Sequence, residues 1–468
     1  MQVPPGIGTG GQAPGQPTGG PWVPPAPPPP SQVFLPPPLP TVAGTLGGGG
    51  KLFEFHPTLS LIESWTDNFN ISSTGRKQEN YRTTLNLGAN ILINGATTRG
   101  GISGASGLTY DTADSSAGVK YFPTISAFVE QYVNPRLSVR VTDSFTRSDE
   151  PSQADAFGLR QQRQTFTSNS FTVSALYLID IISTQTYYTN QIFSSGGTDT
   201  VSHVIGTSAS RPLGAANTIS AGYQFSHTNT SGNNTSGNNA NTSIFGVGTS
   251  GSTTGNTIFG SFSRQLNPYQ TAGVSSSYTW LSSDTDNTRL WNVSLFSTYG
   301  LPSGLSLSSS IGYTHVSPDN QDDTGGVTTN STLSYRWVRA AISLGVFQDF
   351  RQTAVTGQNF GIVQTTGFTG SFSYVITPVI TTNLFATYTT NDATGIGNNS
   401  STPSTNTLTT GAGLNWQLLR WLAMRLQYTY TQYGRGGNSS NGTSSFNGTN
   451  GTGNTSVNQA SVGFFSSF

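Results

Sequence analysis

Residues 81–93 read Tyr-Arg-Thr-Thr-Leu-Asn-Leu-Gly-Ala-Asn-Ile-Leu-Ile, and two kinds of side chain alternate along them. The odd positions are mostly apolar: Tyr81, Leu85, Leu87, Ala89, Ile91 and Ile93. The even positions are polar or small: Arg82, Thr84, Asn86, Gly88 and Asn90. Successive side chains of a strand point to opposite faces, so this period of two predicts a β-strand with one apolar and one polar face.

The same alternation recurs from Lys51 to the end of the chain. The even positions between Trp421 and Tyr430 are apolar or aromatic, and those from Val457 to Phe468 again include Ala460, Val462 and Phe464. Helical spacing of apolar residues is not sustained over a comparable length. The pattern therefore predicts an all-β chain.

The composition indicates where such strands would lie. Only 9% of the 468 residues are charged and 33% are hydrophobic, against roughly 25% and, in a count that includes glycine, roughly 45–50% in typical soluble domains. No stretch approaches the roughly 18 consecutive apolar residues that a membrane-spanning helix needs. An outer wall that faces lipid and an inner wall that faces water account for both observations. We expect a single transmembrane antiparallel up-and-down β-barrel.

Short turns and longer polar loops alternate along the chain, and together they give the number of strands. Eight of the ten prolines after residue 50 fall in these connections; Pro57 and Pro123 lie inside apparent strands. The short turns are expected near residues 94–97, 134–135, 179–182, 212–216, 267–268, 301–303, 337–339, 377–378 and 419–421. The loops are expected near 71–77, 113–118, 149–161, 195–199, 229–254, 283–287, 317–326, 352–359, 392–404 and 434–454. These connections predict about 20 strands, within a range of 18–22, with long loops extracellular and both termini periplasmic.

Residues 1–50 differ from the rest of the chain. They contain no charged residue, yet they hold 15 of the 25 prolines and 12 of the 56 glycines. Such a segment cannot bury a core, so we expect a disordered periplasmic leader over 1–50 and the barrel over 51–468. No basic and apolar signal segment is visible, and we expect that it was removed or lies outside this numbering.

Two short motifs resemble known outer-membrane proteins. The chain ends Val462-Gly463-Phe464-Phe465-Ser466-Ser467-Phe468, and a terminal phenylalanine that closes an amphipathic strand is similar to the signal recognised by the barrel-assembly machinery. Phe464 and Phe468 would carry that signal, while Ser466 departs from the pattern. The opening strand runs into Trp65-Thr66-Asp67-Asn68-Phe69 and resembles the β-barrel porin group, some members of which accompany export systems. This resemblance implies a bacterial outer-membrane location.

Aromatic residues near the expected strand ends favour the same class. Barrels carry aromatic girdles at both membrane interfaces. The residues expected to form them are Trp65, Tyr121, Tyr132, Trp280, Tyr299, Trp337, Trp416 and Trp421. Ordinary cross-strand packing in a soluble sheet is the alternative explanation.

The sequence gives no sign of an enzyme, a cofactor or a metal site. There is no cysteine, and the four histidines, at positions 56, 203, 227 and 315, belong to no metal-ligand motif. His203 falls on the apolar side of its strand and His227 at a loop edge. The balance of 20 basic and 20 acidic residues does not favour a nucleic-acid partner.

Charged residues on the polar side of the strands are the candidate pore lining. These are Arg82, Glu130, Arg140, Asp349, Arg351 and Arg425. They would tune the selectivity of a channel or merely pair within a crowded interior. Glu63 and Asp143 fall on the lipid side, where a local bulge or a position near the headgroups would accommodate them. The remaining lumen positions are small and polar, so a water-filled lumen is expected unless the leader or a loop plugs it.

The leading functional hypothesis is a porin-like channel for passive diffusion of small hydrophilic solutes. One alternative is the barrel component of an export or electron-transfer assembly, in which it sheathes a partner. Another is a surface or adhesive protein that uses the barrel as an anchor. The expected partners are outer-membrane lipid, the barrel-assembly machinery, small solutes and a periplasmic protein that binds residues 1–50. A homo-oligomer is left open.

Overall fold

The computed structural model describes residues 52–71, 77–150, 165–195, 197–232, 251–283, 287–319, 322–352, 362–394, 404–436 and 455–467. The predicted leader and Phe468 lie outside this part of the chain. Within it the backbone forms twenty strands and one short 3₁₀ turn, η1 at Ser115–Ala117. The described residues include no helix that is long and apolar enough to cross a membrane.

The strands each span 12 to 17 residues. Their bounds are β1 Phe53–Thr66, β2 Asn80–Asn94, β3 Thr98–Asp111, β4 Val119–Asn134, β5 Leu137–Ser148, β6 Phe166–Ile179, β7 Ile182–Ser195, β8 Thr198–Leu213, β9 Asn217–Gly232, β10 Gly251–Asn267, β11 Gln270–Ser283, β12 Asn287–Gly300, β13 Leu305–Pro318, β14 Thr324–Arg336, β15 Ala340–Gln352, β16 Ile362–Thr377, β17 Ile380–Thr394, β18 Ser404–Leu419, β19 Leu422–Gly436 and β20 Thr455–Ser467.

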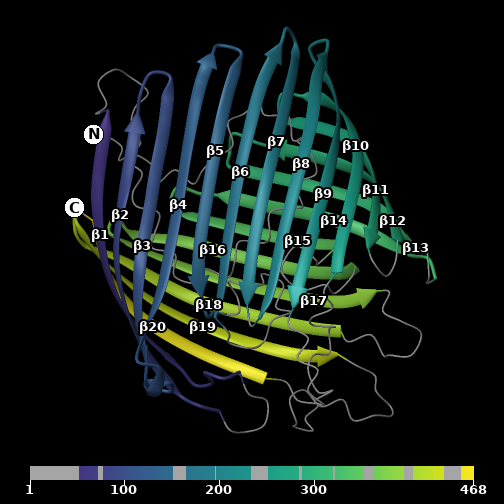
Figure 1. The fold of residues 1–468 in the computed structure, drawn as a ribbon. Helices are drawn as coiled ribbons and strands as arrows, with labels where there is room; N and C mark the ends of the chain where they lie inside the picture. The colour runs from purple at the N-terminus through teal and green to yellow at the C-terminus, as the bar shows by residue number, and fades with distance from the viewer. Residues whose placement is uncertain are drawn as a thin grey trace.

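Every strand pairs antiparallel with its neighbours in the chain, and the sheet closes on itself. The closing ladder joins β1 to β20, from Thr58 opposite Ser467 to Thr66 opposite Gln459. In Figure 1, the purple-to-teal strands form one wall of the barrel and the green-to-yellow strands form the other, and the two chain ends lie near each other. The predicted all-β up-and-down barrel and its twenty strands are confirmed.

The predicted connections also lie where the sequence placed them, with nine short turns at one end and the loops at the other. Two of the turns show the local cause. The side-chain oxygens of Asn134 and Asn267 accept the backbone N–H groups of Arg136 at 2.8 Å and Tyr269 at 2.9 Å. The ladder shifts register beside each of these asparagines. A short polar side chain that bonds to the backbone two residues later favours a turn over continued strand.

Of the four prolines within described strands, Pro212 and Pro318 lie at strand ends, and the two that were expected inside strands lie at the ends of ladders. Pairing of β1 with β20 begins at Thr58, one residue after Pro57. Pairing of β4 with β5 begins at Thr124, one residue after Pro123. Proline has no N–H to donate, so it fits where a strand has a partner on only one side.

The register carries one apolar face around the barrel. Leu61 lies opposite Leu85, Leu85 opposite Leu108, and Leu108 opposite Tyr121. At the seam, Phe464 lies opposite Leu61, so the last strand returns to the same face. Leu61, Leu108, Tyr121 and Phe464 are exposed and Leu85 is half-buried, which makes this the outer, lipid-facing surface.

Glu63 and Asp143 both lie on this outer face, as their position in the alternation predicts. Each carboxylate accepts a hydrogen bond from an outward-facing neighbour, Glu63 from the Thr83 hydroxyl at 2.6 Å and Asp143 from Asn169 Nδ2 at 2.9 Å. The ladders around both residues continue without a register shift. The expected local bulge is therefore wrong, and neighbouring polar side chains provide the accommodation.

Two aromatic side chains, those of Tyr132 and Phe350, contact residues of the inner face. Tyr132, which was expected in the outer girdle, shares the inner face with Glu130 and lies beneath the Arg99 guanidinium, 5.8 Å from its ring centroid. Phe350 is buried against Val316, a residue of the inner face. Phe347 is also buried on the inner face, although residues three positions apart in a strand fall on opposite sides of the alternation. The β14–β15 ladder ends at Gln348, two residues before Phe350, while the β15–β16 ladder continues past Phe350 without a register shift.

Candidate functional site

The face opposite the apolar one lines the lumen and is built largely of small polar side chains. The residues predicted for this face all lie on it: Thr84, Asn86, Thr271, Ser275, Ser277, Ser343, Asn383 and Thr387. They bond to each other across neighbouring strands, for example Ser275 to Ser294 at 2.7 Å and Thr84 to Thr109 at 3.2 Å. Hydroxyl groups that pair across strands satisfy each other's hydrogen-bonding capacity, so the wall needs no long side chains that would project into the lumen.

Aromatic rings on the lumen face lie over glycines of the adjacent strand. In six ladders the ring of an aromatic residue lies over the glycine directly opposite. The pairs are Phe128 with Gly101, Tyr187 with Gly206, Phe259 with Gly222, Phe296 with Gly273, Phe347 with Gly367, and Phe385 with Gly411. In each pair a Cβ added to the glycine would collide with the ring. The rings therefore lie along the wall, where they cover bare backbone.

Charge is distributed unevenly around the lumen. In the strands from β6 to β13, the lumen-facing positions of the described residues include no Asp, Glu, Lys or Arg. The lumen charges lie on β1–β5 and on β14, β15 and β19. One wall of the lumen is thus polar but neutral, and the opposite wall is charged.

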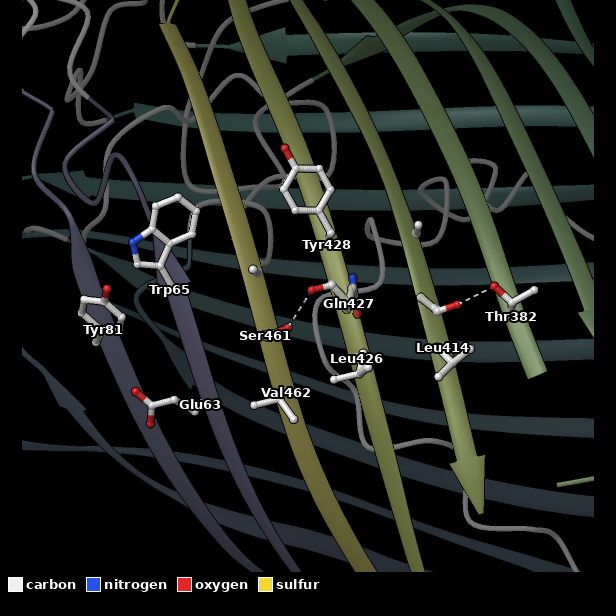
Figure 2. Close-up of a pocket in the computed structure, with 13 residues that line it drawn as sticks. Glu63, Trp65, Tyr81, Thr382, Leu414, Leu426, Gln427, Tyr428, Ser461 and Val462 are labelled. Atoms are coloured by element: carbon white, nitrogen blue, oxygen red, sulfur yellow. Dashed lines mark hydrogen bonds between the residues drawn. The ribbon is translucent and has the colours of Figure 1, made fainter. Parts of the chain in front are cut away.

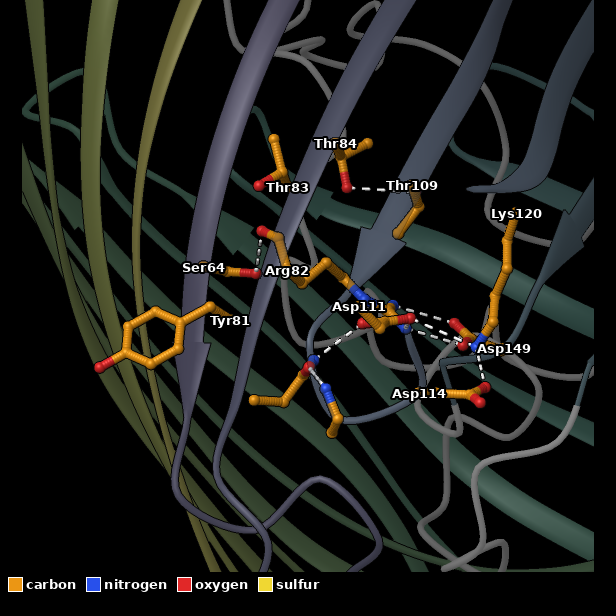
Figure 3. A network of polar contacts seen from close by, with 12 residues as sticks. Ser64, Tyr81, Arg82, Thr83, Thr84, Thr109, Asp111, Asp114, Lys120 and Asp149 are labelled. Carbon is orange, nitrogen blue, oxygen red and sulfur yellow. Dashed lines mark hydrogen bonds and ion pairs between the residues drawn. The ribbon is translucent and has the colours of Figure 1, made fainter. Parts of the chain in front are cut away.

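The largest charged cluster surrounds Arg82 at the loop end of β2 (Figure 3). Its guanidinium binds Asp111 of β3 through Nε at 2.7 Å and Nη2 at 2.9 Å. It also binds Asp149, through Nη2 at 2.7 Å, and Glu150, through Nη1 at 2.8 Å. The Asp111 side chain is fully buried and that of Arg82 is only 11% exposed. Such bidentate, charge-assisted contacts are the strong form of ion pair.

A second cation and an aromatic ring complete this cluster. Lys120 Nζ lies 3.3 Å from Asp111 and 2.8 Å from Asp114. The buried ring of Phe69 lies under both cations, 5.9 Å from the Arg82 guanidinium carbon and 6.0 Å from Lys120 Nζ. Two cations thus face four carboxylates. The cluster ties the polar segments after β1, β3 and β5 to the wall, and Arg82 is neutralised there.

Glu130 and Arg140 lie elsewhere, near the short-turn end of the same wall. They are directly opposite each other on β4 and β5, and Arg99 of β3 is opposite Glu130 on its other side. Arg99 and Arg140 are exposed. Their guanidinium groups rest over Tyr132 and Phe128, 5.8 Å and 5.4 Å from the ring centroids. Stacking on a ring holds a guanidinium in place while its N–H groups remain available.

The other predicted pore-lining residues belong to β15 and β19. Arg425 of β19 is on the lumen face, and its Nε donates to Asn415 at 2.7 Å. Asp349 accepts the backbone N–H of Phe350 at 2.9 Å, just beyond the end of the β14–β15 ladder. Arg351 belongs to β15, but its side chain lies outside the described part of the molecule. The structure thus brings Glu130 and Arg140 together and separates both from Arg82.

The Asp67-Asn68 motif lies at the closing seam of the barrel. Burial raises the pKa of the Asp67 carboxyl, but hydrogen bonds from the Asn458 backbone and side chain and from Lys77 outweigh it, so the pKa lies below the usual 3.8. Asn68, which is also buried, donates from Nδ2 to the Ser456 carbonyl at 3.1 Å. The motif that resembles the porin group therefore joins the first strand to the last.

A shallow hollow of about 580 Å³ lies across the same seam on the outer wall (Figure 2). Trp65, Tyr81, Val462 and Leu426 line it, all on the lipid-facing side. The Glu63 carboxylate is also part of its lining. The hollow is therefore a feature of the membrane-facing surface and not of the lumen.

No protein-family model matches the chain, and no curated protein matches it in sequence. Its fold is similar to solved structures of receptors. The siderophore receptor PirA from Pseudomonas aeruginosa superposes with a TM-score of 0.50 at 11% identity, over 89% of this chain and 80% of that one. The siderophore receptor PirA from Acinetobacter baumannii superposes with a TM-score of 0.50 at 10% identity, over 89% of this chain and 80% of that one.

The ferric enterobactin receptor PfeA from Pseudomonas aeruginosa, in complex with BCV-L6, gives a TM-score of 0.51 at 12% identity, over 90% of this chain and 82% of that one. At identities this low the likeness is one of fold. Together with the closed register and the apolar outer face, it shows that the chain is an outer-membrane-type β-barrel.

Proposed function

We propose that the protein is a porin-like channel of the bacterial outer membrane for passive diffusion of small hydrophilic solutes. The observation that carries this proposal is the lumen wall, where short hydroxyl and amide side chains bond to one another and aromatic rings lie flat over glycines. Barrels of 16–18 strands already leave an aqueous channel, so twenty strands lined in this way leave room for water and solute. Transport needs no energy source in this arrangement.

The charged wall would set the preference among solutes. In this proposal Glu130 and Arg140, with Arg99 beside them, act from β3–β5, and Asp349, Arg351 and Arg425 act from β15 and β19. Lumen charges tune selectivity because they attract counter-ions within a Debye length of roughly 8–10 Å. Arg82 has a different role in this proposal, since its charge is neutralised by three carboxylates. It anchors the loop-end segments.

The same proposal sets the orientation and the partners. The short turns and both chain ends face the periplasm, and the long loops face the exterior, as in bacterial barrels of this type. The last strand, with Phe464 exposed on the lipid side and Phe468 at the terminus, is presented to the barrel-assembly machinery. Residues 1–50 would then extend into the periplasm, where they could contact a partner.

Single-channel conductance in a planar bilayer tests the proposal, with the refolded full chain compared with a variant that lacks residues 1–50. Large, stable, ohmic steps in both forms support an open channel. Steps that appear only after truncation identify the leader as a plug. Silence from both forms, when each migrates as a folded, heat-modifiable barrel, contradicts free diffusion and favours a sheath within an export or electron-transfer assembly, or an anchor.

A further inference from the structure

Two of the four histidines in the chain face each other across neighbouring strands. His203 of β8 is directly opposite His227 of β9. Both lie on the outward face, in the alternation that also points Ile205 and Phe225 outward. Side chains that are directly opposite have Cβ atoms roughly 4.5–5.5 Å apart. The two imidazoles are therefore neighbours, although 23 residues separate them in the sequence.

Each imidazole is held at one nitrogen by a flanking strand. His203 Nδ1 lies 2.9 Å from the Tyr188 hydroxyl and 3.2 Å from Asn190 Nδ2, both on β7. His227 Nδ1 lies 3.2 Å from the Thr254 hydroxyl on β10. Polar partners at one ring nitrogen fix the orientation of a histidine whose other nitrogen binds a metal. The contacts that hold this pair all involve Nδ1, which leaves both Nε2 atoms for a shared ligand.

The pair lies at the loop-end edge of the apolar band. The next outward positions toward the short turns are Ile205 and Phe225, followed by Thr207 and Tyr223. Toward the loops, the outward residues of β9 become polar, Asn229 and Ser231. A bound cation at the height of the histidines would lie among polar groups rather than in the hydrocarbon, where an ion is costly.

We propose that His203 and His227 bind one late first-row divalent metal ion, of the class Cu²⁺, Ni²⁺ or Zn²⁺, through their Nε2 atoms. Neutral imidazole suits these ions. Metal–nitrogen bonds of about 2.0–2.1 Å from each ring can be accommodated by two residues this close together. Water completes the coordination. The described residues include no group of three or more His, Cys, Asp or Glu side chains placed to hold a metal, so this is a two-histidine site of moderate affinity.

The other two histidines provide matched controls. His56 Nε2 lies 3.4 Å from Glu54 on the lumen side, and His315 Nε2 lies 3.3 Å from Asp323 on the outer side. Each is a single imidazole beside one carboxylate. Substitution of either with glutamine removes a potential metal-binding nitrogen without altering the pair.

The test is titration of the refolded full-length protein in detergent with Cu²⁺, followed by electron paramagnetic resonance. We expect one bound ion per barrel with two equatorial nitrogens. His203→Gln and His227→Gln should each weaken binding by about tenfold or more, and Thr254→Val, which loosens a ring without removing a ligand, should have a smaller effect. His56→Gln and His315→Gln should leave the affinity and the spectrum unchanged. Heat-modifiable migration confirms that each variant is folded.

A second measurement uses stability. A metal that binds only the folded state raises the unfolding midpoint, so Zn²⁺ should raise it in the wild type and in His56→Gln but not in the double variant His203→Gln/His227→Gln. Equal Cu²⁺ affinity of the wild type and that double variant would overturn the proposal. So would a spectrum with a single coordinating nitrogen.

Discussion

Asp67 at the end of the first strand accepts two hydrogen bonds from Asn458 in the last. Its Oδ1 accepts the Asn458 backbone N–H at 2.7 Å and its Oδ2 accepts from Asn458 Nδ2 at 2.8 Å. The Asp67 backbone N–H in turn donates to the Asn458 carbonyl at 3.2 Å. These bonds extend the ladder of β1 and β20 by one step beyond Thr66. The side chain thus fastens the barrel where the two ends of the sheet meet.

Removal of the Asp67 carboxylate should destabilise the closed barrel. Hydrogen bonds to a charged group contribute about 1.5–3 kcal/mol each when partly buried, so we expect Asp67→Ala to lower the free energy of unfolding by about 2 kcal/mol. Urea unfolding in detergent, followed by tryptophan fluorescence, measures this. Asp199→Asn is the matched control, because Asp199 is an exposed carboxylate near the loop end of β8. Equal losses in both variants would argue against the fastening role.

The same carboxylate should make stability depend on pH. The pKa of Asp67 in the folded state lies below its ordinary value of 3.8, so its contribution is fully present above the unfolded pKa and is lost as pH falls through the folded one. We therefore expect the difference in unfolding midpoint between wild type and Asp67→Asn to be constant near pH 6 and to shrink below about pH 4. A difference that stays constant to pH 2 would contradict this assignment.

The barrel and its strand number could be predicted because alternation and turn residues are local signals. Asn134-Pro135 and Asn267-Pro268 mark turns through bonds within two residues, and the prolines inside strands fit the ends of ladders. The side of a strand on which a residue lies is also a local property, because it follows from the alternation. Thr84 and Arg140 are examples. Tyr132 was misplaced because its position near a strand end suggested a girdle, whereas alternation put it in the lumen.

Pairings between strands were not predictable. Arg82 pairs with Asp149, which lies 67 residues later in the chain, and no local pattern indicates that contact. The aromatic–glycine pairs and the two facing histidines need the register of each ladder, which no local pattern gives. The contact between Phe350 and Val316 was not predictable either, because it depends on where the β14–β15 ladder ends.

A methyl group on Gly222 should disturb the lumen wall. Its Cβ would overlap the Phe259 ring, so the ring must tilt away from the wall. Overpacking of this kind costs about 1–3 kcal/mol, and we expect Gly222→Ala to lower both stability and single-channel conductance. Gly260→Ala is the control, because only the Ser220 carbonyl, at 3.5 Å, is near its Cβ. The Thr207 carbonyl oxygen also lies 2.6 Å from the Gly222 Cβ, so Phe259→Ala should relieve only the ring's part of the defect in the double variant. Simple additivity of the two losses would refute the ring contact.

Loss of Arg82 should be among the most damaging single changes in the wall. Arg82→Gln leaves Asp111, which is fully buried, with Lys120 as its remaining cation and removes one ion-pair contact each from Asp149 and Glu150. Breaking a buried ion pair costs about 3–5 kcal/mol. Hydrogen exchange should accelerate in residues 111–119 and 149–150, with less change near the short turns. Arg99→Gln, which removes an exposed arginine of the same wall, should leave exchange at the loop end unchanged.

Arg99 and Arg140 should affect ion selectivity rather than stability. Both are exposed on the lumen face, and Glu130 lies between them on the neighbouring strand. Their two positive charges exceed its single negative charge. In a salt gradient across a bilayer, Arg99→Gln/Arg140→Gln should shift the reversal potential toward cation preference, and the shift should be larger in 0.1 M than in 1 M salt, where the Debye length falls from roughly 10 to 3 Å. Arg264→Gln is the matched control, because Arg264 lies near a short turn but on the outward face of β10. A shift of the same size in that control would mean that surface charge, and not the lumen, determines the preference.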